Sequence, residues 1–109
     1  MYQKVYEPIE NRILYFKHLA VPEKWDELWQ ETNDDFFKSD PNCRDWIKLT
    51  KKYLPINSKI LEGGCGLGAL VYALNKNNFK AYGIDYAKNV VSRLNKNWPH
   101  LNIKKGDIR

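Results

Sequence analysis

Short apolar runs alternate with helical patterns in the second half of the chain, and this alternation constrains the fold more than any other feature. The sequence predicts short strands at residues 59–63, 79–86 and 101–107. Between them, residues 66–78 and 87–98 carry apolar side chains at helical spacing. Strand–helix–strand–helix–strand is the pattern of a parallel sheet with right-handed crossovers. The sequence therefore predicts an α/β fold.

Residues 1–58 are predicted to form a helical segment that precedes the sheet. Pro22 suits the first position of a helix, where its missing N–H needs no partner. Trp25 and Trp29 follow at the spacing of one helix face. We expect them to be core aromatics that join this segment to the sheet, with a lid over a ligand site as the alternative. Residues 1–16 fit either a helix or an extended arm.

A second helix is predicted over residues 44–54, before Pro55. Its apolar residues recur at helical spacing and define one stripe: Trp46, Leu49, Tyr53 and Leu54.

Composition excludes several classes of protein. No apolar run approaches the roughly 20 residues that a membrane span needs, and the N-terminus lacks an apolar signal core. We therefore expect a cytoplasmic protein without a membrane partner. Cys43 and Cys65 form no CxxC pair and have no histidine cluster nearby, which argues against a metal site and against a disulfide framework.

Charge is distributed unevenly along the chain. Residues 1–45 contain 6 Lys/Arg and 10 Asp/Glu, whereas residues 46–109 contain 12 Lys/Arg and 3 Asp/Glu. A basic half is compatible with nucleic-acid binding, but its lysines are scattered over positions expected to face water. A solvated surface is the preferred interpretation, and a nucleic-acid partner stays open.

The three acids of the basic half are Glu62, Asp85 and Asp107, and each falls at the C-terminal end of a predicted strand. They are 23 and 22 residues apart, which is one strand–helix unit each. Ligands of open α/β sheets bind in the crevice beyond the carboxyl ends of the strands. The placement of the acids therefore predicts one ligand site at this edge.

The stretch ILEGGCGLG, residues 60–68, places four glycines at the first of these strand ends. It satisfies the dinucleotide pattern G-x-G-x-x-A through Gly64, Gly66 and Ala69, which makes an NAD(P)-dependent oxidoreductase one interpretation. However, Glu62 would hold a negative charge close to the pyrophosphate, which Coulomb's law disfavours. An acid at this position suits a cationic ligand.

The same stretch resembles the first motif of class I S-adenosylmethionine-dependent methyltransferases, in which an aliphatic pair and an acid precede G-x-G-x-G. AYGIDYAKNVV, residues 81–91, is similar to the second-strand motif of that family, and GDIR, residues 106–109, to the third-strand motif. One departure is Gly63, where the family more often has an aliphatic residue. The resemblance implies a Rossmann-like sheet over residues 59–109 and S-adenosylmethionine as cofactor.

By this resemblance, Glu62 helps to bind the ammonium side of the cofactor, Asp85 accepts the ribose hydroxyls, Asp107 accepts the adenine amino group, and Tyr86 lies against the adenine face or only packs. The implied cofactor-binding set is Glu62, Gly63, Gly64, Cys65, Gly66, Gly68, Asp85, Tyr86 and Asp107. Cys65 is expected to fill the turn, because nothing nearby in the sequence would activate its thiol. No catalytic residue can be named, and the methyl acceptor is unidentified, with a small molecule expected.

A complete sheet of this family has seven strands, which at this spacing would need roughly 150 residues. We therefore expect the chain to be the N-terminal part of such a domain, with strand order 3-2-1 and little or no activity alone. The strand at 59–63 would then be an exposed edge. Exposed apolar edges recruit other chains, so self-association is expected there.

Overall fold

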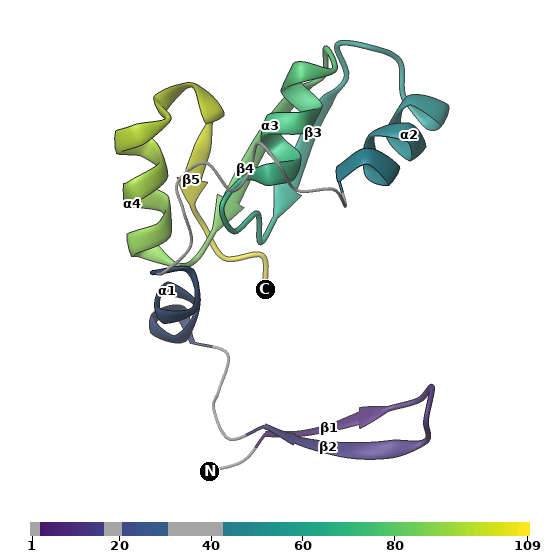
Figure 1. Ribbon diagram of the computed structural model, residues 1–109, viewed down its shortest axis with the longest axis vertical. Helices are drawn as coiled ribbons and strands as arrows, with labels where there is room; N and C mark the ends of the chain where they lie inside the picture. Colours follow the sequence, from purple (N-terminus) through teal and green to yellow (C-terminus); the bar gives the residue numbers. More distant parts are fainter. Residues whose placement is uncertain (1–2, 17–20, 31–42) are drawn as a thin grey trace.

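The computed structural model describes residues 3–16, 21–30 and 43–109. Figure 1 shows the elements in chain order. They are β1 (Gln3–Glu7), β2 (Arg12–Phe16), α1 (Pro22–Gln30), α2 (Cys43–Tyr53), β3 (Lys59–Gly63), α3 (Ala69–Lys76), β4 (Lys80–Asp85), α4 (Lys88–Asn97), the short 3-10 helix η2 (Pro99–Leu101) and β5 (Ile103–Lys105). Among the residues described, no helix is both long enough and apolar enough to cross a membrane.

Three parallel strands form the main sheet, in the order β3-β4-β5. Helix α3 connects β3 to β4, and α4 connects β4 to β5 (Figure 1). The predicted α/β fold with three parallel strands in the second half is confirmed. The carboxyl ends of all three strands consequently lie at one edge of the sheet, as parallel pairing requires.

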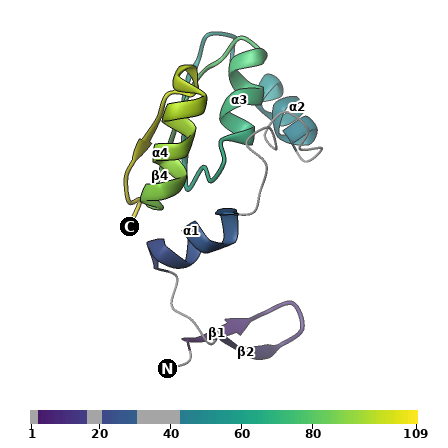
Figure 2. The ribbon, with the colours of Figure 1, turned by 60° about the vertical axis from the view of Figure 1, so that its left-hand side comes forward.

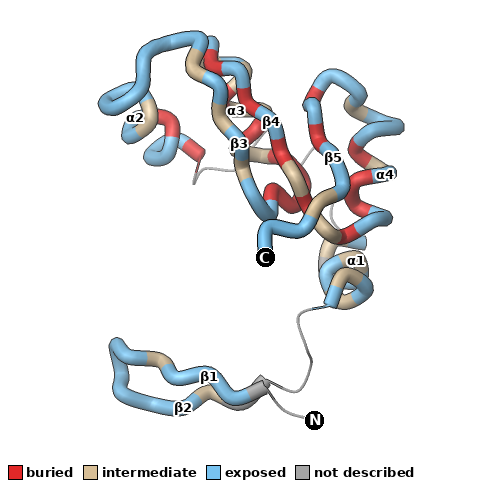
Figure 3. The backbone as a smooth tube through the Cα atoms, turned by 180° about the vertical axis from the view of Figure 1, so that it is seen from behind, coloured by how far each residue is buried: buried red, intermediate tan, exposed pale blue. Residues whose placement is uncertain are grey.

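The core lies between the sheet and helices α3 and α4. Burial alternates along β4, so that Ala81 and Asp85 are buried while Tyr82 on the opposite face is 43% exposed. The helices contribute the largest fully buried side chains, which are Val71, Leu74 and Leu94. Figure 3 shows the buried positions concentrated where these helices meet the strands. One face of the sheet is therefore covered by helices, because α3 and α4 both pack against it.

Helix α1 is attached to α4 by one side chain from each helix. Asp26 of α1 accepts the backbone N–H groups of Asn89 and Val90 at 3.3 and 3.0 Å, which caps the first turn of α4. In the other direction, Arg93 of α4 donates to the carbonyl oxygen of Trp29 at 3.1 Å near the end of α1. Figure 2 shows α1 below the start of α4 in this arrangement. The contact fixes α1 close to the carboxyl edge of the sheet.

The N-terminus corrects the prediction of a helical segment over residues 1–58. Residues 3–16 form an antiparallel hairpin in which Tyr6 pairs with Ile13. Its turn is closed by Glu7, whose carboxylate accepts the Ile9 N–H at 2.7 Å, and by Asn11, which adopts a positive φ of 51°. The extended alternative was the right one because alternating residues pair across two strands instead of forming a helix face.

Helix α2 has its expected position but a different buried side. It buries Cys43 and Ile47 against α3, whereas two members of the predicted stripe, Trp46 and Tyr53, are 57% and 69% exposed. The apolar stripe therefore identifies a helix correctly. Among the described residues, however, much of that stripe is exposed.

Candidate functional site

A glycine loop follows β3 and turns back towards β4. The N–H of Cys65 donates to the carbonyl oxygen of Ile84 at 3.0 Å, which joins the loop to the adjacent strand. Gly64 and Gly66 have φ values of 69° and 54°, a region that side chains disfavour. At Gly66 a Cβ atom would also lie 3.2 Å from Cζ2 of Trp29. The loop therefore needs glycine at Gly66 for both its backbone angle and the close approach of α1.

Asp85 is the most buried acid among the described residues, at 7% exposure. One carboxylate oxygen accepts the N–H of Gly66 and the other accepts the N–H of Ala87, both at 2.9 Å. Asp85 thus connects the glycine loop to the turn before α4. Each oxygen has a further lone pair that can accept another hydrogen bond.

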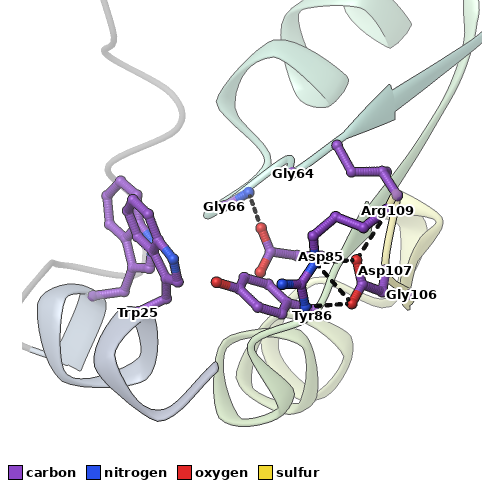
Figure 4. A pocket seen from close by; sticks show the side chains of 10 residues that line it. Trp25, Gly64, Gly66, Asp85, Tyr86, Gly106, Asp107 and Arg109 are labelled. Carbon is purple, nitrogen blue, oxygen red and sulfur yellow. Dashed lines mark hydrogen bonds and ion pairs between the residues drawn. The ribbon is translucent and has the colours of Figure 1, made fainter. Parts of the chain in front are cut away.

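A pocket of about 310 Å³ opens at this edge of the sheet (Figure 4). Trp25 lies on one side of Tyr86, and the Asp85 carboxylate points to Gly66 of the glycine loop. Its lining is Trp25, Trp29, Gly64, Gly66, Asp85, Tyr86, Gly106, Asp107, Ile108 and Arg109. The pocket therefore combines aromatic walls with two acids from the ends of adjacent strands.

Both tryptophans of α1 belong to this pocket. Trp29 is partly buried against the main core, whereas Trp25 is 37% exposed. Trp29 therefore joins α1 to the sheet, as expected, and also lines the pocket. Trp25 does not belong to the buried core and contributes a wall of the pocket instead.

Glu62 lies in an adjoining hollow of about 270 Å³, which shares Trp29, Gly64 and Gly66 with the first pocket. The three predicted acids are therefore divided between two neighbouring hollows, since Glu62 does not line the first. Its Oε2 atom is buried and has no hydrogen-bond partner. Burial, together with the negative charge of Asp85, raises the pKa of Glu62 from 4.5 to about 7.

Asp107 is held by the side chain of Arg109. The Arg109 Nε and Nη2 atoms donate to the two carboxylate oxygens at 3.0 and 2.7 Å, and the Arg109 backbone N–H donates at 3.0 Å. These hydrogen bonds lower the pKa of Asp107 to about 2. The guanidinium carbon of Arg109 also lies 5.4 Å from the centre of the Tyr86 ring.

Sequence reasoning missed the contribution of Arg109 and of Ile108. Both line the pocket, but positions one and two residues after Asp107 give no indication of which way their side chains turn. The motif GDIR could have drawn attention to Arg109 as a cation two residues after Asp107. Only the tertiary arrangement shows that it also reaches Tyr86.

The remaining predicted residues have packing positions. Cβ atoms at Gly63 and Gly68 would each lie 2.6 Å from a side-chain atom, of Ile108 and Ile103 respectively, and neither glycine lines the two hollows. Cys65 lines the Glu62 hollow and is 7% exposed. Burial raises the pKa of its thiol to about 12, so the thiol stays protonated near neutral pH.

The chemistry of the site is that of hydrogen-bond acceptors. The oxygens of Asp85, Glu62 and Asp107 suit hydroxyl, amino or ammonium groups of a ligand. Within residues 3–16, 21–30 and 43–109, no group of three His, Cys, Asp or Glu side chains is arranged to hold a metal ion.

The sequence matched no protein-family model and no curated protein. A proposal for function therefore depends on the residues and geometry of this site.

Proposed function

We propose that this chain binds S-adenosylmethionine at the carboxyl edge of β3, β4 and β5, and that it is the cofactor-binding part of an S-adenosylmethionine-dependent methyltransferase with a Rossmann-like sheet. The three motifs that resemble this enzyme family lie at the ends of three adjacent parallel strands. Aromatic, glycine and acidic residues line the hollows at that edge.

The hydrogen bond between Gly66 and Asp85 is the observation that carries the proposal. A dinucleotide pyrophosphate binds to glycine-loop N–H groups at the start of a helix. Here the Gly66 N–H already donates to a carboxylate at 2.9 Å. A phosphate at the same place would lose that donor and meet the negative charge of Asp85. The loop therefore favours a ligand without phosphate, such as S-adenosylmethionine, over NAD.

The unpartnered oxygen of Glu62 fits the cationic end of this cofactor. A buried acceptor without a hydrogen bond is costly, and an ammonium group would supply the missing donor. A nearby cation would also favour ionised Glu62 and lower its pKa from about 7. Binding of such a ligand is therefore expected to strengthen as the pH rises from 6 to 8.

The other pocket residues fit the adenosine part. Asp85 has one lone pair left on each oxygen for a pair of hydroxyl groups. The Tyr86 ring offers a flat surface for an adenine ring. Asp107 can accept an amino group through oxygens that Arg109 now holds.

When bound, S-adenosylmethionine supplies a methyl group on a sulfonium for transfer to a nucleophilic acceptor. The side chains of this chain would hold the cofactor in position and exclude water from it. We propose a small molecule as acceptor. Trp25 and Trp29 line the pocket, and in this proposal they would border the acceptor.

Calorimetry with S-adenosylhomocysteine and with NAD tests the proposal. We expect S-adenosylhomocysteine to bind and NAD not to bind. Glu62→Gln should weaken S-adenosylhomocysteine binding, while Glu23→Gln, which changes an exposed glutamate of α1, should leave it unchanged. Binding of NAD alone would favour an oxidoreductase, and binding of neither ligand would reject the proposed site.

A further inference from the structure

Arg109 contacts two other residues that line the first pocket, Asp107 and Tyr86. Its guanidinium holds the Asp107 carboxylate through two nitrogen atoms, at 3.0 Å from Nε and 2.7 Å from Nη2. It also lies over the Tyr86 ring at 5.4 Å. Figure 4 shows these three side chains together on the side of the pocket opposite Trp25.

Asp107 differs from the other two acids of the site in its partner. Asp85 is held by backbone N–H groups, which belong to the fold itself. Glu62 has a buried oxygen without a partner. In the described part of the chain, only Asp107 of these three is bound by a side-chain cation, and a side chain can move away by rotation of its own bonds.

We propose that Arg109 is an internal competitor for the adenosine end of the pocket. Its planar guanidinium takes both the acceptor oxygens of Asp107 and the face of Tyr86, which are the two groups that an adenine ring would use. An adenosine ligand then binds only after Arg109 has turned out of the pocket. The inference rests on the proposed function, since it names what controls access to that same site.

Because the Arg109–Asp107 ion pair is partly exposed, separating it costs little free energy. The Arg109 and Asp107 side chains are 72% and 46% exposed, so both remain partly hydrated. Exposed ion pairs are weak because water competes for both charges, and salt screens them further. Arg109 therefore lowers the affinity for adenosine but does not prevent adenosine from binding.

Two ligands separate this inference from the function itself. Adenosine has the ring but no charged tail, so it reports on Tyr86 and Asp107. S-adenosylhomocysteine reports on the whole cofactor site. We expect Arg109→Ala to bind both about three- to tenfold more tightly, the combined effect of a weak ion pair and one cation–π contact. Arg109→Lys should lie between, because lysine keeps the charge but not the planar fork.

Lys104→Ala is the matched control, because it removes a positive charge from an exposed position of β5 outside the pocket and should leave both affinities unchanged. A salt series in the unchanged protein provides a second measurement. Adenosine affinity should rise as salt weakens the Arg109–Asp107 pair, and this rise should be absent in Arg109→Ala.

Equal affinities in Arg109→Ala and the unchanged protein, or weaker binding in the variant, would overturn the competitor role of Arg109. The proposed function would still stand. Absence of S-adenosylhomocysteine binding in every variant would overturn the proposed function, and the inference with it. An equal gain in Lys104→Ala would attribute the effect to general charge and also reject the competitor.

Discussion

Asp26 and Val90 lie 64 residues apart in the chain, and the Asp26 carboxylate accepts the Val90 N–H at 3.0 Å. This hydrogen bond fixes α1 against the start of α4. It also places Trp29, on the same helix, over Gly66, where a Cβ atom would lie 3.2 Å from the indole ring. Together with the hydrogen bond from Arg93 to the Trp29 carbonyl oxygen, this capping side chain fixes where the aromatic wall of the pocket stands.

Asp26→Ala should reduce the free energy of unfolding by about 0.5–2 kcal/mol, because α4 loses the acceptor for its first N–H groups. Urea unfolding measures the change. Glu23→Ala removes an exposed negative charge from the same helix and serves as control. Equal stability of the two variants would mean that the cap contributes nothing in solution.

Asp85→Ala should affect both binding and folding. It removes a carboxylate that holds Gly66 and Ala87, so the free energy of unfolding should fall by about 1–3 kcal/mol. S-adenosylhomocysteine affinity should fall about ten- to a hundredfold. Calorimetry on the folded variant, checked by circular dichroism, measures the second effect. An unchanged dissociation constant would remove Asp85 from the ligand site.

Gly66→Val should abolish ligand binding, because a valine side chain meets Trp29 and strains a backbone with φ of 54°. Gly64→Ala is the control for backbone strain, since Gly64 has a similar φ of 69° but no atom within 4 Å of an added Cβ. Both variants should lose stability, and only Gly66→Val should also disturb the contact between the loop and Trp29 of α1. Normal binding by Gly66→Val would reduce the loop to a structural turn.

Glu62 makes stability depend on pH, because its pKa is about 7 in the folded protein against an ordinary value of 4.5. Below pH 4.5 the carboxyl is protonated in both states. As the pH rises towards 7 the unfolded chain releases the proton first, so stability falls, and above 7 the loss is constant. Glu62→Gln should therefore be more stable than the unchanged protein at pH 8, by about 1–3 kcal/mol.

Denaturant unfolding at pH 4.5 and pH 8 measures this difference, with Glu23→Gln as the exposed control. The gain of Glu62→Gln should be small at the lower pH. A gain of the same size at both pH values would show that Glu62 is not protonated preferentially in the folded protein.

We also expect the chain to self-associate through β3. This strand pairs with β4 on one side, no strand among the described residues pairs with its other side, and Leu61 is 64% exposed. Unpaired edges of this kind recruit another chain. Light scattering at micromolar concentration should show a dimer or larger species, and Leu61→Lys should reduce it. Ile9→Lys, at an exposed site on the hairpin, is the control, and a stable monomer of the unchanged chain would contradict the expectation.

The sequence by itself determined the elements of the second half and the edge at which the site lies. Strand and helix periods reflect which side chains each element buries, and this preference is local enough to read from neighbouring positions. Parallel pairing then brings the ends of β3, β4 and β5 to one edge, which accounts for the positions of Asp85 and Asp107 around one pocket. Residues 1–16 fitted either a helix or an extended arm, and the hairpin itself was not predicted because its stability depends on pairing across two strands.

The tertiary structure alone decided which partners these residues have. Nothing in the sequence spacing shows that Asp85 holds Gly66, that Glu62 lies in a separate hollow, or that Arg109 covers Tyr86. The same is true of α2, whose apolar stripe identified a helix but not its buried side. The physical reason is that a local pattern records how strongly a side chain avoids water, whereas its partner depends on which distant segments the packed core brings within hydrogen-bond or van der Waals distance.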